Sequence, residues 1–296
     1  MHQELAILLA LTAAFLFAVS NVVEQRVAAQ APMEESLRPR LLVRLFRHPA
    51  WQGGFVADVG GYGAQAAALA FGALLLVAPL IACGLLFSLL LEARLARTRL
   101  PTADLVAAAL LCGGVGLFLG IGDPSGGRAV VAATRWAPVA IVGAAIIGLC
   151  AVGRRRARGP ARAMLFGLAA GLTFGINSAV TKTVVHVIAD DGVLHVFTRW
   201  ELYALAVLSL GGLLIVQSAF QAGSLKSALP ALEVSEPVVA TIIGAAILDE
   251  HLHADTLVDR VLIAVSITAM LYGTLALARS EGERGQPADR VGVAHV

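Results

Sequence analysis

Residues 11–25 read LTAAFLFAVSNVVEQ, and residues 168–182 read LAAGLTFGINSAVTK. Placed over one another, the two stretches match at apolar positions and at a polar pair, Ser20-Asn21 in the first and Asn177-Ser178 in the second. The apolar matches are Leu11 with Leu168, Phe17 with Phe174, and Val23 with Val180. Small residues also recur every four positions, namely Ala10, Ala14 and Ala18 in the first copy and Gly167, Gly171 and Gly175 in the second. This spacing places them on one helix face, where another helix can approach closely.

A second pair of matched positions follows downstream of each copy. Pro79 lies thirteen residues before Glu92, and Pro237 lies thirteen residues before Glu250. Two matches in the same order predict an internal duplication. The chain is therefore expected to consist of two related halves.

The composition indicates what kind of unit is duplicated. Hydrophobic residues make up 58% of the 296 residues, charged residues only 14%, and the mean hydropathy is +0.82. A soluble domain would carry about 25% charged residues. The net charge of +2 is too small to indicate a nucleic-acid partner. The sequence therefore predicts an all-α, polytopic membrane protein. The lipid bilayer is one of its expected partners.

Nine stretches are long and apolar enough to be read as membrane spans, given that a span needs about 20 apolar residues. They are residues 5–27, 51–71, 74–95, 102–120, 136–152, 163–187, 196–218, 225–248 and 257–278. Residues 28–49 and 120–127 are expected to be loops. We divide the chain into a first repeat of four spans (1–125), a linking helix with a basic loop (126–160), a second repeat of four spans (161–280) and a disordered cytoplasmic tail (281–296).

The basic residues predict the orientation. With the N-terminus outside and the C-terminus inside, most of the 22 Lys and Arg residues fall on the inner side, as the positive-inside rule requires. The single linking span then makes the second repeat enter the membrane from the opposite side. Such inverted-topology repeats are common in secondary transporters, which bind their substrate near the midplane between the halves.

The paired motifs resemble those of the drug/metabolite transporter superfamily, of the EamA type. The resemblance rests on the small-residue first helix, on the segment ending in Pro79 and Glu92, and on its copy QSAFQAGSLKSALPALEVSEPVVATIIGAAILDEHL (217–252). It covers roughly residues 5–120 and 163–279. The family implies a helical inner-membrane carrier with a central cavity between two inverted halves. The basic first loop and the outside N-terminus are similar to the NIPA-type magnesium-transporter branch, and nine spans depart from the common ten.

Ionisable side chains within the spans are the main candidates for a site, because each is costly to insert into a membrane. Asp58, followed by Tyr62 and Gln65, is read as a cation- or proton-binding carboxylate, or else as a buried partner of Arg or a backbone cap. Glu233 and Glu236 are one turn apart and can share a proton or a hard cation. Their alternative is a polar position near the start of the helix.

A second group of candidates occupies equivalent places in the two copies: Asn21, Glu24, Asn177, Ser178 and Lys182. Pseudo-symmetry would bring them to the interface between the halves, whereas Glu24 and Lys182 could instead snorkel to opposite membrane surfaces. The second alternative is favoured for Lys182. Gln65 and Gln217 are read either as substrate hydrogen-bond donors or as polar contacts between helices. Glu92 and Glu250, at span ends, are interpreted as structural anchors.

The leading functional hypothesis is a secondary transporter of a small solute, a metabolite or drug, working by alternating access with ion or proton coupling. The alternative is a magnesium or other divalent-cation transporter, for which the metal ligands stay unknown. A non-transporting scaffold or receptor is a weaker alternative. No HExxH, nucleophile or ATP-binding motif occurs, so neither an enzyme nor a cofactor is expected. A homodimer is compatible with all of these hypotheses.

Overall fold

The computed structural model describes residues 2–28, 30–32, 35–97, 99–222 and 225–284. Almost all of its elements are helices. The long helices are α1 (His2–Ala28), α3 (Pro49–Phe71), α6 (Thr102–Gly122), α7 (Ala137–Arg155), α8 (Gly159–Asp191), α9 (Trp200–Gln221), α10 (Leu225–Ala246) and α11 (Leu257–Arg284). The shorter elements are α2 (Pro39–Phe46), α4 (Leu74–Ala82), α5 (Gly84–Ala96), η2 (Ala133–Trp136), η3 (His195–Thr198), β1 (Ser125–Gly126) and β2 (Glu250–His251).

In the part of the chain that the structure describes, seven helical segments are long and apolar enough to cross a membrane. They are Gln3–Ala28, Leu74–Leu95, Thr102–Gly122, Ala133–Arg155, Gly159–Asp191, Trp200–Gln221 and Leu257–Ser280. This fits an all-α polytopic membrane protein. Helices α3 and α10 are not among the seven; α3 carries Asp58 and Gln65 among several glycines, and α10 carries two glutamates and two prolines. The count of nine crossings therefore stays a prediction.

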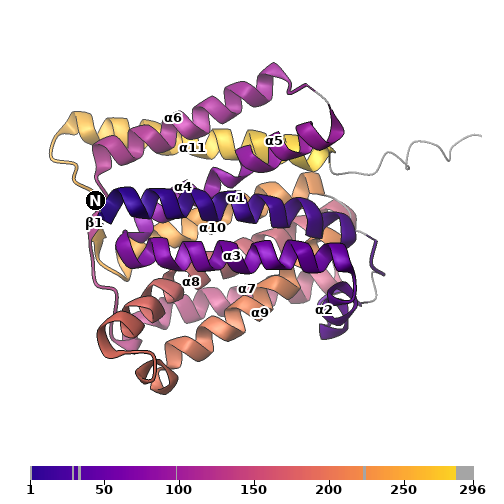
Figure 1. Cartoon of the computed structure of the whole chain (residues 1–296), viewed down its shortest axis with the longest axis horizontal. Coiled ribbons are helices and arrows are strands. Elements are labelled where there is room, and N and C mark those ends of the chain that lie inside the picture. Colours follow the sequence, from indigo (N-terminus) through magenta and orange to yellow (C-terminus); the bar gives the residue numbers. More distant parts are fainter. Residues whose placement is uncertain (1, 29, 33–34, 98, 223–224, 285–296) are drawn as a thin grey trace, which may run out of the picture.

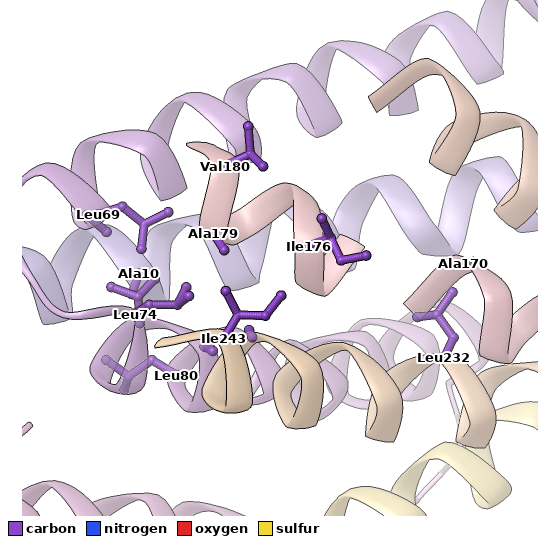
Figure 2. Packing of buried hydrophobic residues seen from close by; sticks show 14 of the residues in the cluster. Ala10, Leu69, Leu74, Leu80, Ala170, Ile176, Ala179, Val180, Leu232 and Ile243 are labelled. Atoms are coloured by element: carbon purple, nitrogen blue, oxygen red, sulfur yellow. The ribbon is translucent and has the colours of Figure 1, made fainter. Parts of the chain in front are cut away.

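The long helices run side by side, with α1, α3, α4 and α10 across the middle of the bundle (Figure 1). Helix α1 packs on α3, α4 and α5, whereas α8 packs on α7, α9 and α10. Helices α6 and α11 pack on each other along one side of the molecule. Where α1, α3, α4, α8 and α10 meet, buried aliphatic side chains fill the space, including Ala10, Leu74, Ile176 and Ile243 (Figure 2).

The small-residue stripes act as predicted. Ala10, Ala14 and Ala18 are buried on α1. The glycines of α8 lie against α10 so closely that a methyl group added to Gly175 would sit 2.7 Å from the carbonyl oxygen of Glu236. Close approach of helix backbones at glycine is the expected use of such a stripe in a membrane.

The predicted span 74–95 is divided into two helices at Cys83. Pro79 lies inside α4, where it has no N–H for the helical ladder, and the Cys83 N–H bonds to the Leu80 carbonyl three residues back. The interruption is one residue long, because Cys83 keeps a right-handed helical backbone and α5 begins at Gly84. Hydropathy could not detect the break because Cys83 is as apolar as its neighbours.

The two predicted loops contain short elements. Within residues 28–49, Pro39 opens α2, which buries Leu41 and Leu45. Within residues 120–127, β1 pairs antiparallel with β2, which places Ser125 beside His251 and Gly126 beside Glu250. At the C-terminus, α11 continues through Arg284, so residues 281–284 are helical rather than part of the predicted tail. The rest of that tail lies outside the described residues.

Candidate functional site

An internal cavity of about 70 Å³ lies between the middle helices, which is room for a few water molecules. The side chains that line it come from α1, α3, α5, α8, α9 and α10, with one from α4. Among the described residues, Lys, Arg and His are absent from its lining, whereas four carboxylates are present: Glu24, Asp58, Glu233 and Glu236. The cavity is therefore strongly acidic in chemical character.

The four carboxylates differ in how their oxygens are used. Glu24 is buried, accepts a 3.1 Å hydrogen bond from the Ser20 hydroxyl and accepts another from the Gln217 amide. Within the described residues, Asp58, Glu233 and Glu236 have neither a hydrogen-bond nor an ion-pair partner. Their oxygens are left for water or for a ligand in the cavity. In the part of the chain that the structure describes, Asp58 therefore has no arginine partner, which its alternative reading would require.

Hydroxyl and amide groups complete the polar part of the cavity. Asn21, Tyr62, Gln65, Ser88 and Ser178 line it. Across the two halves, the Gln65 amide donates a 2.9 Å hydrogen bond to the Ser178 hydroxyl, which in turn donates to the Phe174 carbonyl. These groups can offer oxygen acceptors and N–H or O–H donors, but no sulfur or imidazole ligand.

Eight of the ten residues predicted for the site line the cavity, and the other two, Asn177 and Gln217, do not. Asn177 is buried and accepts a 3.2 Å hydrogen bond from Ser209 of α9. Gln217 instead reaches the cavity through Glu24, to which it donates. Both side chains connect helices, which is one of the two readings proposed for Gln217.

An aromatic wall consists of Phe17, Tyr62 and Phe174, of which Tyr62 was predicted for the site and the two phenylalanines were not. The ring of Phe17 meets Tyr62 edge to face at 5.0 Å, and Tyr62 lies 6.4 Å from Phe174. Each phenylalanine also lies over a glycine, Phe17 over Gly61 and Phe174 over Gly212. The available signal was the matched position of the two phenylalanines in the repeat.

Lys182 was predicted to snorkel to a membrane surface, and this prediction is wrong. Its side chain is only 6% exposed, and its ammonium group lies 2.5 Å from the carboxylate of Glu250, which is fully buried. That carboxylate also accepts hydrogen bonds of 2.8 Å from the backbone N–H groups of Leu74 and Leu75, at the start of α4. The ammonium group and the positive end of α4 together compensate the buried charge of Glu250.

A more exposed ion pair lies next to Glu250. Arg135 donates hydrogen bonds of 2.5 and 2.7 Å to the two carboxylate oxygens of Asp249. These bonds hold the pKa of Asp249 below its usual value. With the β1–β2 pair and the Lys182–Glu250 pair, this contact joins the loops between helices at one end of the bundle. Glu250 thus acts as the structural anchor that its sequence position suggested.

The cavity does not have the geometry of a preformed metal centre. Among the described residues, no group of three or more His, Cys, Asp or Glu side chains is arranged to hold a metal ion. Oxygen donors are nevertheless the kind that hard cations and ammonium groups prefer. The arrangement suits a cation that retains its own hydration shell, a protonated amine, or protons shared among the carboxylates.

No family model matches the chain, and no solved structure matches it. An uncharacterized protein of Corynebacterium glutamicum, Cgl0250/cg0304, is 34% identical over 278 residues. The matched region covers 93% of this chain and 95% of the relative, so it includes both halves of the bundle. The chain therefore belongs to the same protein family as this corynebacterial protein.

Proposed function

We propose that the chain is a secondary transporter that moves a small, positively charged solute across the cytoplasmic membrane by alternating access. One observation carries the proposal: four carboxylates on three helices face one cavity, whose lining in the described part of the chain includes no basic side chain. Charged groups inside a membrane protein are costly, and they are kept where they bind ions, protons or substrates. A scaffold or receptor gives no such use to these residues.

Acidic groups in a cavity this small also favour coupling to protons. Like charges at close range cannot all stay ionised, so bringing a cation in and releasing protons are linked events. A carrier can use this linkage to exchange its cargo against protons. Asp58, Glu233 and Glu236 are the proposed exchange sites because their oxygens have no protein partner, whereas Glu24 is held by Ser20 and Gln217.

We further propose that the chain crosses the membrane nine times, in two inverted halves, as in the drug/metabolite transporter superfamily. Matched contacts support this arrangement. Phe17 of α1 packs on Gly61 of α3, and its repeat counterpart Phe174 of α8 packs on Gly212 of α9. With α7 as the single crossing between the halves, the N-terminus lies outside and the C-terminus inside.

Contacts between the halves are matched as well. Gln65 of the first half donates to Ser178 of the second, and Gln217 of the second half donates to Glu24 of the first. Both hydrogen bonds lie where one half would rock against the other in alternating access. Opening the cavity towards either side of the membrane would break and reform a small number of such polar contacts.

The nature of the cation decides between two versions of the proposal. A protonated organic amine fits the combination of carboxylates with the aromatic wall, since aromatic faces attract cations. Magnesium fits the all-oxygen lining, because Mg²⁺ usually keeps several of its waters. The absence of a three-ligand cluster among the described residues favours the organic cation.

Flux through the purified protein in sealed liposomes tests the proposal. A pH-sensitive dye is enclosed in one set and a magnesium dye in another, and a panel of organic cations is added outside. The control variant is Asp190→Asn, at an exposed position at the end of α8. We expect solute-dependent proton movement that Asp58→Asn reduces at least tenfold and Asp190→Asn leaves unchanged. Magnesium entry lost in Asp58→Asn would assign the metal version, and flux that Asp58→Asn does not alter would refute both.

A further inference from the structure

Helix α2 has two faces that differ in what covers them. Leu41 and Leu45 are buried, at 0% and 2% exposed, where α2 lies against α3 and α9. On the outer side, Val43 and Phe46 are 55% and 51% exposed. In Figure 1, α2 lies at the end of the bundle where α1 finishes and α3 begins. A short helix with exposed apolar and basic residues at a bundle end is typical of the membrane interface.

Two arginines of α2 and the arginine that directly follows it share the outer side of this segment. Arg40, Arg44 and Arg47 follow one another at spacings of four and three residues, which puts them on one helix face. Together with Val43 and Glu35 they line one surface hollow. Guanidinium groups donate several hydrogen bonds in a planar fork that matches phosphate oxygens.

The described residues of this hollow compensate its positive charge only in part. Glu35, whose side chain is 10% exposed, accepts two 2.7 Å hydrogen bonds from Arg44, and these bonds lower its pKa. Arg40 lies 3.9 Å from the same carboxylate but is 83% exposed. Among the described residues that line the hollow, one carboxylate therefore faces three guanidinium groups, and its bond to Arg44 fixes the middle one in place.

The segment that carries the hollow is attached to the bundle rather than loosely connected. The Leu37 N–H donates a 2.9 Å hydrogen bond to the Ser218 hydroxyl of α9. From the same end of α9, the Gln221 amide donates to the carbonyl of Pro32. Stacked aromatic rings of Trp51 and Phe55, with Phe46 beside them, secure the other side. The hollow is thus present before any ligand arrives.

We propose that this hollow binds the phosphate headgroup of an anionic membrane lipid. Its phosphate would accept hydrogen bonds from Arg40 and Arg47, while its acyl chains pass beside Val43 and Phe46. A lipid fits better than a soluble anion because the exposed apolar side chains border the basic ones. Anionic lipids attract basic juxtamembrane residues by about 1 kcal/mol for each residue. The proposal is independent of what the central cavity carries.

Lipid titration of the full chain, purified in detergent and stripped of lipid, tests the inference. Bound lipid is counted by native mass spectrometry with phosphatidylglycerol, with phosphatidylcholine and with soluble glycerol 3-phosphate as a competitor. Two charge-removing variants are compared with the wild type, Arg40→Gln/Arg47→Gln in the hollow and Arg94→Gln/Arg279→Gln as a control. The control residues are exposed near the C-terminal ends of α5 and α11. A third variant, Glu35→Gln, removes the counter-charge.

We expect the wild type to prefer phosphatidylglycerol, and the α2 variant to lose that preference on the order of tenfold. The control variant should keep it, and Glu35→Gln should bind phosphatidylglycerol more tightly. Equal losses in the two arginine variants would overturn the site, as would weaker binding by a Glu35→Gln protein of unchanged melting temperature. Competition by glycerol 3-phosphate at the concentration of the lipid would overturn the lipid as ligand in favour of a soluble phosphate.

Discussion

Glu250 and Glu236 are acidic residues in the second half of the chain, and they differ in their burial and in their hydrogen-bond partners. Glu250 is completely enclosed and accepts from Lys182 and from two backbone N–H groups. Glu236 faces the central cavity and has no partner among the described residues. A carboxylate whose oxygens are all satisfied holds helices together, whereas one with free oxygens is available for a ligand. The comparison therefore separates acid groups that hold helices together from acid groups whose oxygens are available to a ligand.

The largest expected effect follows from breaking the Glu250 network. Lys182→Met removes the ammonium group and leaves a buried carboxylate without its counter-charge. We expect the free energy of unfolding to fall by about 3–5 kcal/mol, measured by denaturant titration in mixed micelles. Adding Glu250→Gln to the variant removes the orphaned charge and should restore part of the loss. A decrease below about 1 kcal/mol in the single variant would contradict the structural role of the pair.

A smaller effect on stability is expected when Glu236, which faces the cavity, is replaced. Glu236→Gln replaces a carboxylate that has no protein partner with a neutral amide, so the free energy of unfolding should stay within about 1 kcal/mol of the wild type or rise. Flux in liposomes should nevertheless fall at least tenfold, because a proposed exchange site is lost. The comparison fails if this variant unfolds as easily as Lys182→Met, or if its transport equals that of the wild type.

The smallest effect concerns Asp249, the exposed neighbour of Glu250. Its hydrogen bonds with Arg135 hold its pKa below the usual value, so the pair contributes stability above the pKa of an unfolded Asp, about 3.9. That contribution disappears as the pH falls through the lower, folded-state pKa. Asp249→Asn should therefore lower the melting temperature slightly at pH 7 and less at pH 3. A difference from the wild type that is the same at both pH values would exclude this linkage.

Much of the helical architecture could be predicted because it depends on local apolar length. The nine stretches chosen from the sequence fall mainly on helices, although α3 and α10 are not among the seven described segments that are long and apolar enough to cross a membrane. The small-residue stripe on α8 was also predictable, because glycines four residues apart necessarily share a helix face. The division between α4 and α5 was not, since it depends on the local hydrogen bonding at Cys83, four residues after Pro79.

The candidate site was predictable residue by residue but not as an arrangement. Asp58, Glu233 and Glu236 stood out because ionisable groups are rare in apolar segments. Their convergence with Glu24 required the packing of α1, α3 and α10. Asn177 and Gln217 had equally suggestive positions, yet their side chains turn to neighbouring helices rather than to the cavity.

By itself, the sequence determined that the protein is helical and apolar, and that the stretches around Phe17 and Phe174 correspond. It also determined that acidic side chains, which are costly to bury, occur within its apolar segments. Only the tertiary structure decided which of these carboxylates have hydrogen-bond or ion-pair partners. Lys182 and Glu250 are 68 residues apart, and their 2.5 Å contact depends on the packing of α8 against the loop that follows α10. The physical reason is that burial and charge compensation are properties of neighbours in space, which a residue's place in the chain does not specify.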